Sequence, residues 1–236
     1  MKQTAVRAVW ERGSETIRRG VVLAYLRVTD RNRRAEVRFV EGLPFLSLPS
    51  VFPPDSFTTA LVLRSRHRLE GRRVLEVGCG AGALAVLAAG IASSVVAADV
   101  SAEAIQNTTL NIAWHKAQNV EVVESDLFEH IHGVFDTIVF NAPFFPGRAS
   151  SAKERMWLGD NGRILERFLR DAPSHLAPDG EIWLTHSSVA DESSFRAALD
   201  GAGWSWTVMD SRDILIETFK LYRAVRHVDA AEGGRG

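Results

Sequence analysis

Two carboxylates of this chain lie in or directly after short apolar runs, where they could bind a nucleoside-like ligand. Glu76 stands in Arg73-Val74-Leu75-Glu76-Val77, two residues before a glycine, a position that suits a ligand carrying an amino group. Asp99 ends the run Val95-Val96-Ala97-Ala98 about twenty residues later, where an acid can accept hydrogen bonds from both ribose hydroxyls. Asp99 could instead be the N-cap of the following helix, but Ser101 is a better N-cap, which disfavours this explanation.

Glycines occupy every second position between these acids, in Gly78-Cys79-Gly80-Ala81-Gly82. Glycine tolerates tight turns and close approach of a ligand, and the N-terminus of a following helix favours bound polar groups. The apolar run before the turn predicts a buried strand, and Leu84 to Ala89 predicts an apolar helix. This context fits a nucleotide-type site, although a dinucleotide site or a purely structural turn would use similar residues.

The surrounding chain alternates between predicted strands and helices, which indicates parallel strand pairing. The last two strands have no helix between them, which predicts a hairpin around Asp210-Ser211-Arg212-Asp213. The pattern predicts an α/β fold with a doubly wound, seven-stranded, mostly parallel sheet and an antiparallel C-terminal hairpin. The predicted strands are 73–77, 94–98, 119–123, 135–140, 181–186, 204–210 and 214–226, and the predicted helices are 82–90, 102–114, 160–176 and 191–202.

This order of motifs resembles class I S-adenosylmethionine-dependent methyltransferases, whose Rossmann-like sheet is closed by an antiparallel pair. The resemblance implies that S-adenosylmethionine is the cofactor and that Glu76 and the turn backbone hold its methionine end. In Glu124-Ser125-Asp126-Leu127-Phe128, it implies that Asp126 accepts a hydrogen bond from the adenine amino group and Leu127 packs on the ring. An ordinary turn residue is the alternative for Asp126. The cofactor-binding residues implied are Glu76, Gly78, Gly80, Gly82, Asp99, Val100, Asp126, Leu127 and Asn141.

A fourth motif, Asn141-Ala142-Pro143-Phe144, follows an apolar strand, at whose carboxyl end open α/β sheets bind ligands. It is similar to the N-P-P-F or N-P-P-Y motif of methyltransferases that act on amide or exocyclic amino nitrogens. The resemblance implies that Asn141 and the Ala142 carbonyl accept the two N–H groups of the acceptor, and that Phe144 packs on its planar group. Ala142 replaces the usual first proline, which retains the carbonyl but releases the fixed φ and adds an N–H. A strand ending in an ordinary turn is the alternative.

Two further stretches are similar to release-factor glutamine methyltransferases. They are residues 42–46 followed by 51–59, before the glycine turn, and the glycine-rich loop Trp157-Leu158-Gly159-Asp160-Asn161-Gly162 after the fourth motif. The bacterial enzymes of that family begin with a helical bundle that helps to hold the release factor, whereas residues 18–40 here predict strands. Protein glutamine is therefore one candidate acceptor, beside a small metabolite or an RNA or DNA base.

Composition limits the other classes of function. The chain has 236 residues, 46% of them hydrophobic, a net charge of −1 and one cysteine, Cys79. No apolar run reaches the roughly 20 residues that span a bilayer, and no signal peptide is visible. The single cysteine excludes an internal disulfide and fits a cytoplasmic protein. The scattered histidines predict no metal site.

We therefore expect an N-terminal extension with short strands over residues 1–55, a methyltransferase domain over 56–228 and a disordered tail over 229–236. The predicted activity is transfer of a methyl group to an amide or amino nitrogen. The non-enzymatic alternative is a cofactor-binding scaffold or an RNA-binding protein, because the first 38 residues contain ten Lys or Arg and only four Asp or Glu. The sequence leaves the acceptor and the oligomeric state open.

Overall fold

A seven-stranded sheet forms the centre of the computed structural model, which describes residues 34–145, 147–150, 154, 156–188, 190–214 and 217–226. The strand order is β5-β4-β3-β6-β7-β9-β8, and only β9 runs antiparallel to its neighbours. This arrangement confirms the predicted doubly wound fold with an antiparallel C-terminal pair. The strands are β3 (Arg73–Val77), β4 (Ser94–Asp99), β5 (Val120–Glu124), β6 (Phe135–Phe140), β7 (Leu176–Ser187), β8 (Trp204–Ile214) and β9 (Glu217–Arg226).

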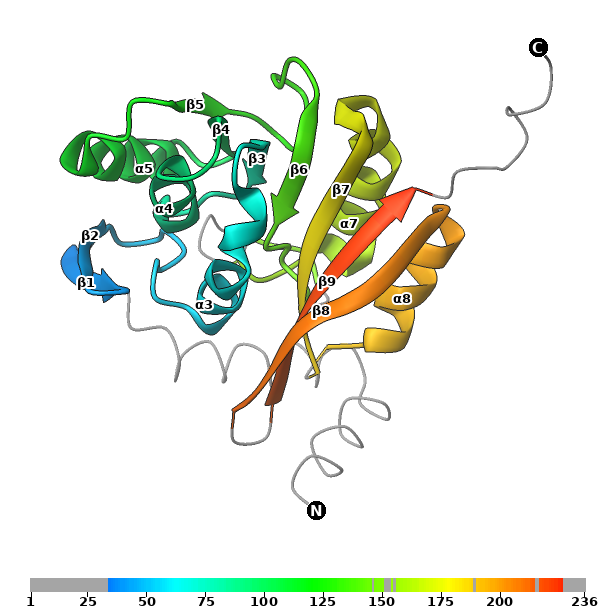
Figure 1. Ribbon diagram of the computed structural model, residues 1–236. Coiled ribbons are helices and arrows are strands. Elements are labelled where there is room, and N and C mark those ends of the chain that lie inside the picture. The colour runs from blue at the N-terminus through cyan, green and yellow to red at the C-terminus, as the bar shows by residue number, and fades with distance from the viewer. Residues whose placement is uncertain are drawn as a thin grey trace, which may run out of the picture.

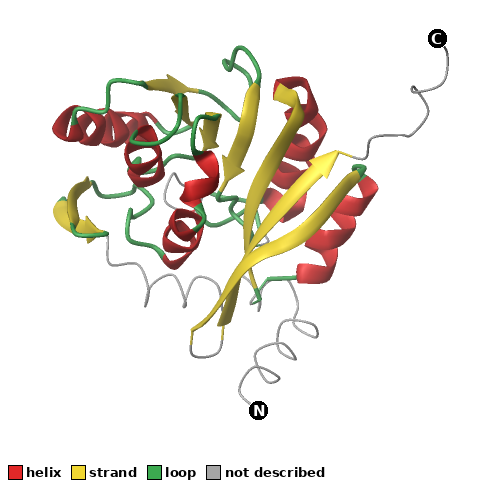
Figure 2. Ribbon diagram, in the orientation of Figure 1, coloured by secondary structure: helices red, strands yellow, loops and turns green. Residues whose placement is uncertain are grey.

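Helices cover both faces of this sheet (Figures 1 and 2). Side chains alternate across a strand, so Val74 packs into one core cluster with residues of α3 and α4. Its neighbour Leu75 packs into the other cluster with residues of α7 and α8. The helices are α3 (Phe57–Arg64), α4 (Ala83–Ala89), α5 (Ala102–His115), α7 (Arg163–Asp171) and α8 (Glu192–Gly201), with short 3-10 turns η1 (Arg66–Leu69), η2 (Asp160–Gly162) and η3 (Ala172–His175).

A separate hairpin of β1 (Glu36–Val40) and β2 (Leu43–Ser47) precedes the sheet and lies against α5. The side chain of Asn107 accepts a hydrogen bond from the Leu48 N–H at 2.8 Å and donates to the Leu46 carbonyl at 2.9 Å. The hairpin contains the end of residues 18–40, for which strands were predicted. Residues 18–33 and the predicted tail lie outside the described residues, and the domain boundaries stay a prediction.

Two predicted elements are wrong in detail. The helix predicted at 160–176 is divided into η2, α7 and η3, because Gly162 has a left-handed φ of +90° at the start of α7 and Pro173 stands at the start of η3. The turn predicted at Asp210–Asp213 does not exist, since β8 continues to Ile214 and pairs Asp213 with Thr218 of β9. The polar residues of this segment suggested a turn. They remain in the strand because this end of the hairpin is exposed to solvent.

Candidate active site

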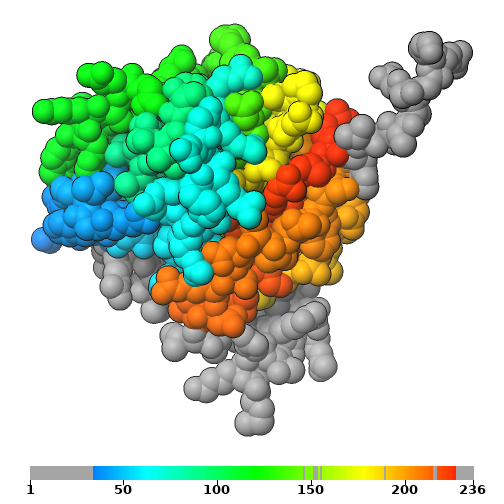
Figure 3. All heavy atoms as spheres, in the orientation of Figure 1, coloured from blue at the N-terminus to red at the C-terminus, as the bar shows by residue number. Residues whose placement is uncertain are grey.

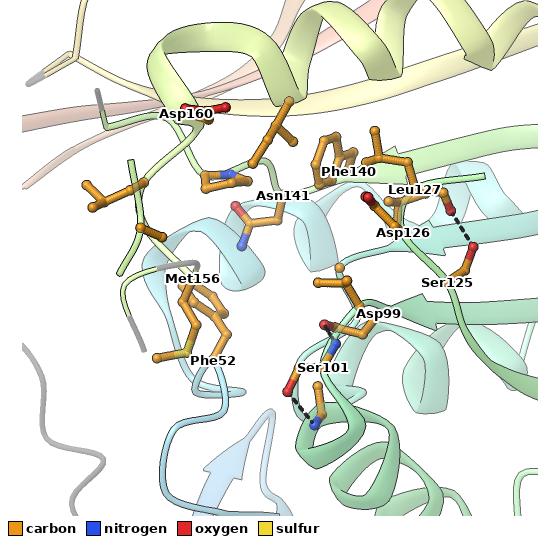
Figure 4. Close-up of a pocket in the computed structure, with 18 of the residues that line it drawn as sticks. Phe52, Asp99, Ser101, Ser125, Asp126, Leu127, Phe140, Asn141, Met156 and Asp160 are labelled. Carbon is orange, nitrogen blue, oxygen red and sulfur yellow. Dashed lines mark hydrogen bonds between the residues drawn. The ribbon is translucent and has the colours of Figure 1, made fainter. Parts of the chain in front are cut away.

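A cleft of about 420 Å³ opens at the carboxyl ends of the parallel strands. Four of its lining residues come from consecutive strand ends: Gly78 after β3, Asp99 at the end of β4, Asp126 after β5 and Asn141 after β6. Figure 4 shows Asp99, Asp126 and Asn141 around one space. The cleft has the size of a small-molecule site, at the edge where open α/β sheets bind ligands.

The carboxylate of Asp99 is fixed by backbone N–H groups. Its Oδ2 accepts from Gly80 and its Oδ1 from Ser101, each at 3.0 Å. Burial raises the pKa of Asp99, and the N–H groups of Ser101 and Gly80 oppose this rise. Each oxygen has a second lone pair, so the oriented carboxylate can still accept hydroxyl groups from the cleft. Ser101 caps α5 by accepting from the Ala104 N–H at 3.3 Å, as its sequence position predicts.

Glu76 is buried in β3 beside a smaller cavity that also touches Gly78 and Asn141. Its Oε2 has no hydrogen-bond partner among the described residues. Burial raises the pKa of Glu76 to about 8, although the Ala85 N–H opposes the rise. A buried carboxylate oxygen without a donor is costly, whereas an ammonium group would satisfy it. This side chain therefore fits the amino group of S-adenosylmethionine.

The three glycines of the turn all have left-handed φ angles, but their surroundings differ. Gly78 lines the cleft, so its bare backbone faces ligand space. A Cβ on Gly80 would lie 3.1 Å from Phe52, and one on Gly82 would lie 2.8 Å from Thr108. Close packing against the protein itself therefore also disfavours a side chain at positions 80 and 82.

Asp126 and Leu127 line the same cleft from the loop after β5. Leu127 is 7% exposed and has a φ of +55°, and its carbonyl accepts from the Ser125 hydroxyl at 3.0 Å. Asp126 pairs with Arg167 of α7 at 3.0 Å. Arg167 also lines the cleft. Sequence reasoning missed it, because an arginine in an amphipathic helix carries no distinguishing signal.

The amide of Asn141 is held on both sides by hydroxyl groups. Its Nδ2 donates to Thr58 Oγ1 at 2.9 Å, and its Oδ1 accepts from Thr185 Oγ1 at 2.5 Å. Thr58 belongs to α3 and Thr185 to β7, and both are buried. The segment that contains Thr58 was singled out in the sequence, but neither threonine was predicted as a partner of Asn141.

The other residues of the fourth motif lie next to Asn141. Ala142 is buried in the core. Phe144 lies beside the cleft rather than among its lining residues, with ring centroids 4.9 Å from Phe145 and 5.8 Å from His186. His186 is itself buried, and this burial lowers its pKa to about 4, so the imidazole is neutral at pH 7. The contact of His186 with Phe144 was not predicted.

The glycine-rich loop packs directly on this motif. The Gly159 N–H donates to the Phe145 carbonyl at 2.8 Å, and the Phe145 N–H donates to the Trp157 carbonyl at 3.0 Å. A Cβ on Gly159 would lie 2.3 Å from the Pro143 carbonyl oxygen, which forbids any side chain there. Residues 157–162 and the fourth motif therefore form one substructure.

Within the described part of the chain, no group of three or more His, Cys, Asp or Glu side chains could hold a metal ion. None of the helices described is long and apolar enough to span a membrane.

Residues 42–200 match the family model of the methyltransferase small domain. This chain belongs to the methyltransferase small domain family. It is 30% identical over 195 residues to a Methanocaldococcus jannaschii protein named provisionally as a protein N5-glutamine methyltransferase, covering 79% of this chain and 98% of that one. It is 31% identical over 198 residues to the ribosomal RNA small subunit methyltransferase C of Cronobacter sakazakii, covering 79% and 50%. This chain therefore spans about half the length of the second relative.

Solved methyltransferase structures share the fold. The T. thermophilus 16S rRNA N2 G1207 methyltransferase in complex with S-adenosylmethionine and guanosine superposes with a TM-score of 0.59 at 21% identity, covering 82% of this chain and 50% of that one. The Mtq2–Trm112 complex of E. cuniculi gives 0.58 at 22% identity, covering 75% and 99%. Family and relatives together identify this methyltransferase small domain protein as an S-adenosylmethionine-dependent methyltransferase.

Proposed function

We propose that this enzyme methylates a planar amide or amino nitrogen and that its acceptor is a protein glutamine. The observation that carries the proposal is the amide of Asn141, which lines the cleft and is fixed by Thr58 and Thr185. A fixed amide next to the cofactor cleft suits an enzyme that acts by positioning.

The cofactor would bind across the carboxyl ends of the strands. Glu76 would take its ammonium group, because the unpartnered Oε2 is buried beside the smaller cavity that Gly78 and Asn141 also line. Asp99, with Val100 next to it, would hold the ribose, and Asp126 and Leu127 would bind the adenine. Gly78 would lie against the cofactor, and Gly80 and Gly82 would fix the turn. When bound, S-adenosylmethionine supplies a methyl group on a sulfonium sulfur.

The acceptor would be oriented by the fourth motif. The Oδ1 of Asn141 receives one hydrogen bond, from Thr185, and has a second lone pair for an acceptor N–H. The Ala142 carbonyl would accept the other N–H, and Phe144 would pack on the planar group. These two hydrogen-bond acceptors would direct the lone pair of the substrate nitrogen towards the cleft, and no covalent enzyme intermediate is needed.

Glutamine is favoured over a nucleobase by the extent of the similarity. The M. jannaschii relative named for glutamine methylation matches over 98% of its own length, whereas the ribosomal RNA methyltransferase matches over 50%. The other half of that RNA methyltransferase lies outside the aligned region.

A methyl-transfer assay with the full chain tests the proposal. The acceptors are a peptide with one glutamine, the same peptide with asparagine in its place, and a guanine-containing RNA, with products identified by mass spectrometry. We expect methylation of the glutamine peptide, and a loss of about 100-fold in kcat/KM for Asn141→Ala with nearly unchanged cofactor affinity.

Gln106→Ala, an exposed change on α5, is the matched control. Methylation of RNA alone would replace glutamine by a nucleobase as acceptor. Full activity of Asn141→Ala would reject the role of the fourth motif.

A further inference from the structure

A third cavity, of about 560 Å³, lies on another part of the molecule. Arg68 of η1 and Arg72, just before β3, line one side, and Thr207, Val208 and Met209 of β8 line another. Glu181 of β7 and Arg223 of β9 complete the lining, and none of these residues belongs to the methyl-transfer cleft. In Figure 3 the cyan segment that includes η1 borders the red and orange strand segments of β9 and β8.

The cavity is organised around one buried carboxylate. Glu181 is 3% exposed, and its Oε1 accepts from Trp183 Nε1 at 2.8 Å. Its Oε2 accepts from Arg223 Nε, and its Oε1 lies 3.7 Å from Arg72 Nη1. A buried carboxylate with two arginines limits the movement of both guanidinium groups, so they are already in place before a ligand arrives.

Most of the guanidinium N–H groups remain available. Arg68 is exposed, and its guanidinium group has no hydrogen bond or ion pair with any described residue. Among the same residues, the guanidinium of Arg223 donates only through Nε, to Glu181. The guanidinium of Arg72 donates only through Nη1, to the Asp136 carbonyl and Thr137 Oγ1 at 3.1 Å each. The side chains of Arg72 and Arg223 are 34% and 37% exposed, so their remaining donors can reach a ligand.

The charges of the cavity are unequal, because three arginines face one carboxylate. The resulting excess of two positive charges would neutralise a phosphate dianion, and the planar guanidinium group matches the geometry of phosphate oxygens. The chain as a whole has a net charge of −1, so the excess is local to this surface. We propose that this cavity binds a single phosphate group, as inorganic phosphate or a phosphomonoester.

The test is isothermal titration of the full chain with inorganic phosphate, at constant ionic strength set with chloride. We expect saturable binding at one site, weakened about tenfold or more by Arg68→Gln and partly restored by Arg68→Lys, because a charge-assisted hydrogen bond is lost in the first variant and a cation is kept in the second. Arg68 is chosen because its replacement leaves Glu181 paired. Arg170→Gln, an exposed arginine beside Asp171 outside the cavity, is the matched control.

Cofactor titration of each variant confirms an intact fold. A second arm uses a short RNA with and without a 5′-phosphate. Binding that depends on the 5′-phosphate supports a phosphomonoester site, whereas equal binding of both RNAs without binding of inorganic phosphate would overturn the proposal in favour of a nucleic-acid backbone site. Absence of phosphate binding, or identical affinity in Arg68→Gln, would also overturn it.

Discussion

The side chain of Asn141 donates to the hydroxyl of Thr58 across 83 residues of sequence, at 2.9 Å. Thr58 stands in the second position of α3, whose N-cap Ser56 accepts from the Thr59 N–H at 3.0 Å and hydrogen-bonds the Thr58 hydroxyl, also at 3.0 Å. The cap of a short helix therefore orients the residue that we assign to acceptor binding.

Replacing Thr58 with valine should lower kcat about tenfold while the cofactor affinity stays nearly constant. Valine keeps the buried shape but removes the oxygen that accepts from Asn141, so the amide can rotate away from its working orientation. Steady-state kinetics with the methyl acceptor and calorimetry with S-adenosylmethionine separate the two effects. Thr109→Val, on the exposed side of α5, should change neither value. A kcat like that of the wild type would show that Thr185 alone is sufficient.

Glu76→Gln should stabilise the ligand-free protein, and increasingly so at higher pH. Folding raises the pKa of Glu76 from its ordinary value of 4.5 to about 8, so the folded state favours the neutral acid. The stability that the neutral acid contributes is complete below its unfolded pKa and is lost as pH rises through about 8. Urea unfolding between about pH 5 and pH 8 should show the difference between variant and wild type growing with pH.

The control for that experiment is Glu121→Gln, an exposed glutamate on β5. Glu76→Gln should also weaken cofactor binding about tenfold or more, since an ionic hydrogen bond to the ammonium group is lost. A difference that does not depend on pH would contradict the assigned protonation.

Asp99→Ala should abolish measurable binding of both S-adenosylmethionine and S-adenosylhomocysteine. The substitution removes the proposed ribose acceptor and leaves the N–H groups of Gly80 and Ser101 without their carboxylate. Asn141→Ala should bind both ligands nearly as well as the wild type, because Asn141 is assigned mainly to the acceptor. Calorimetric titration of the three proteins decides this, and retained affinity in Asp99→Ala would remove the ribose assignment.

Gly82→Ala should cost more stability than Gly133→Ala. Both glycines have left-handed φ angles, +76° and +87°, so each substitution carries a backbone cost of about 1–2 kcal/mol. Only at Gly82 does the new Cβ also collide, 2.8 Å from Thr108, whereas nothing lies within 4 Å at Gly133. We expect an additional 1–3 kcal/mol, roughly, in the urea-unfolding free energy of Gly82→Ala. Equal losses would mean that Thr108 moves aside freely.

The order of strands and helices from residue 73 onwards was predictable, because the apolar runs have the length and spacing of buried parallel strands. Parallel pairing then brings the carboxyl ends to one edge, which explains why Asp99, Asp126 and Asn141 line one cleft. The break at Gly162 was not predicted, because a single glycine in a helical pattern is compatible with either outcome.

The partners that fix the site were beyond the sequence. Thr58, Thr185 and Arg167 are common residue types with no local pattern of their own, and they meet Asn141 and Asp126 only through long-range packing. Whether Oε2 of Glu76 has a hydrogen-bond partner likewise depends on which backbone donors surround it in the folded chain.

The double hold on Asn141 has a consequence for the order in which the enzyme matures on the ribosome. Thr58 is synthesised 83 residues before Asn141, and Thr185 follows it by 44. The strand ends that line the cleft with Asp99 and Asp126 are complete earlier, whereas Asn141 lacks its second partner until β7 has emerged and docked. In a nascent chain that ends before β7, the side chain of Asn141 is therefore not yet fixed for binding the methyl acceptor.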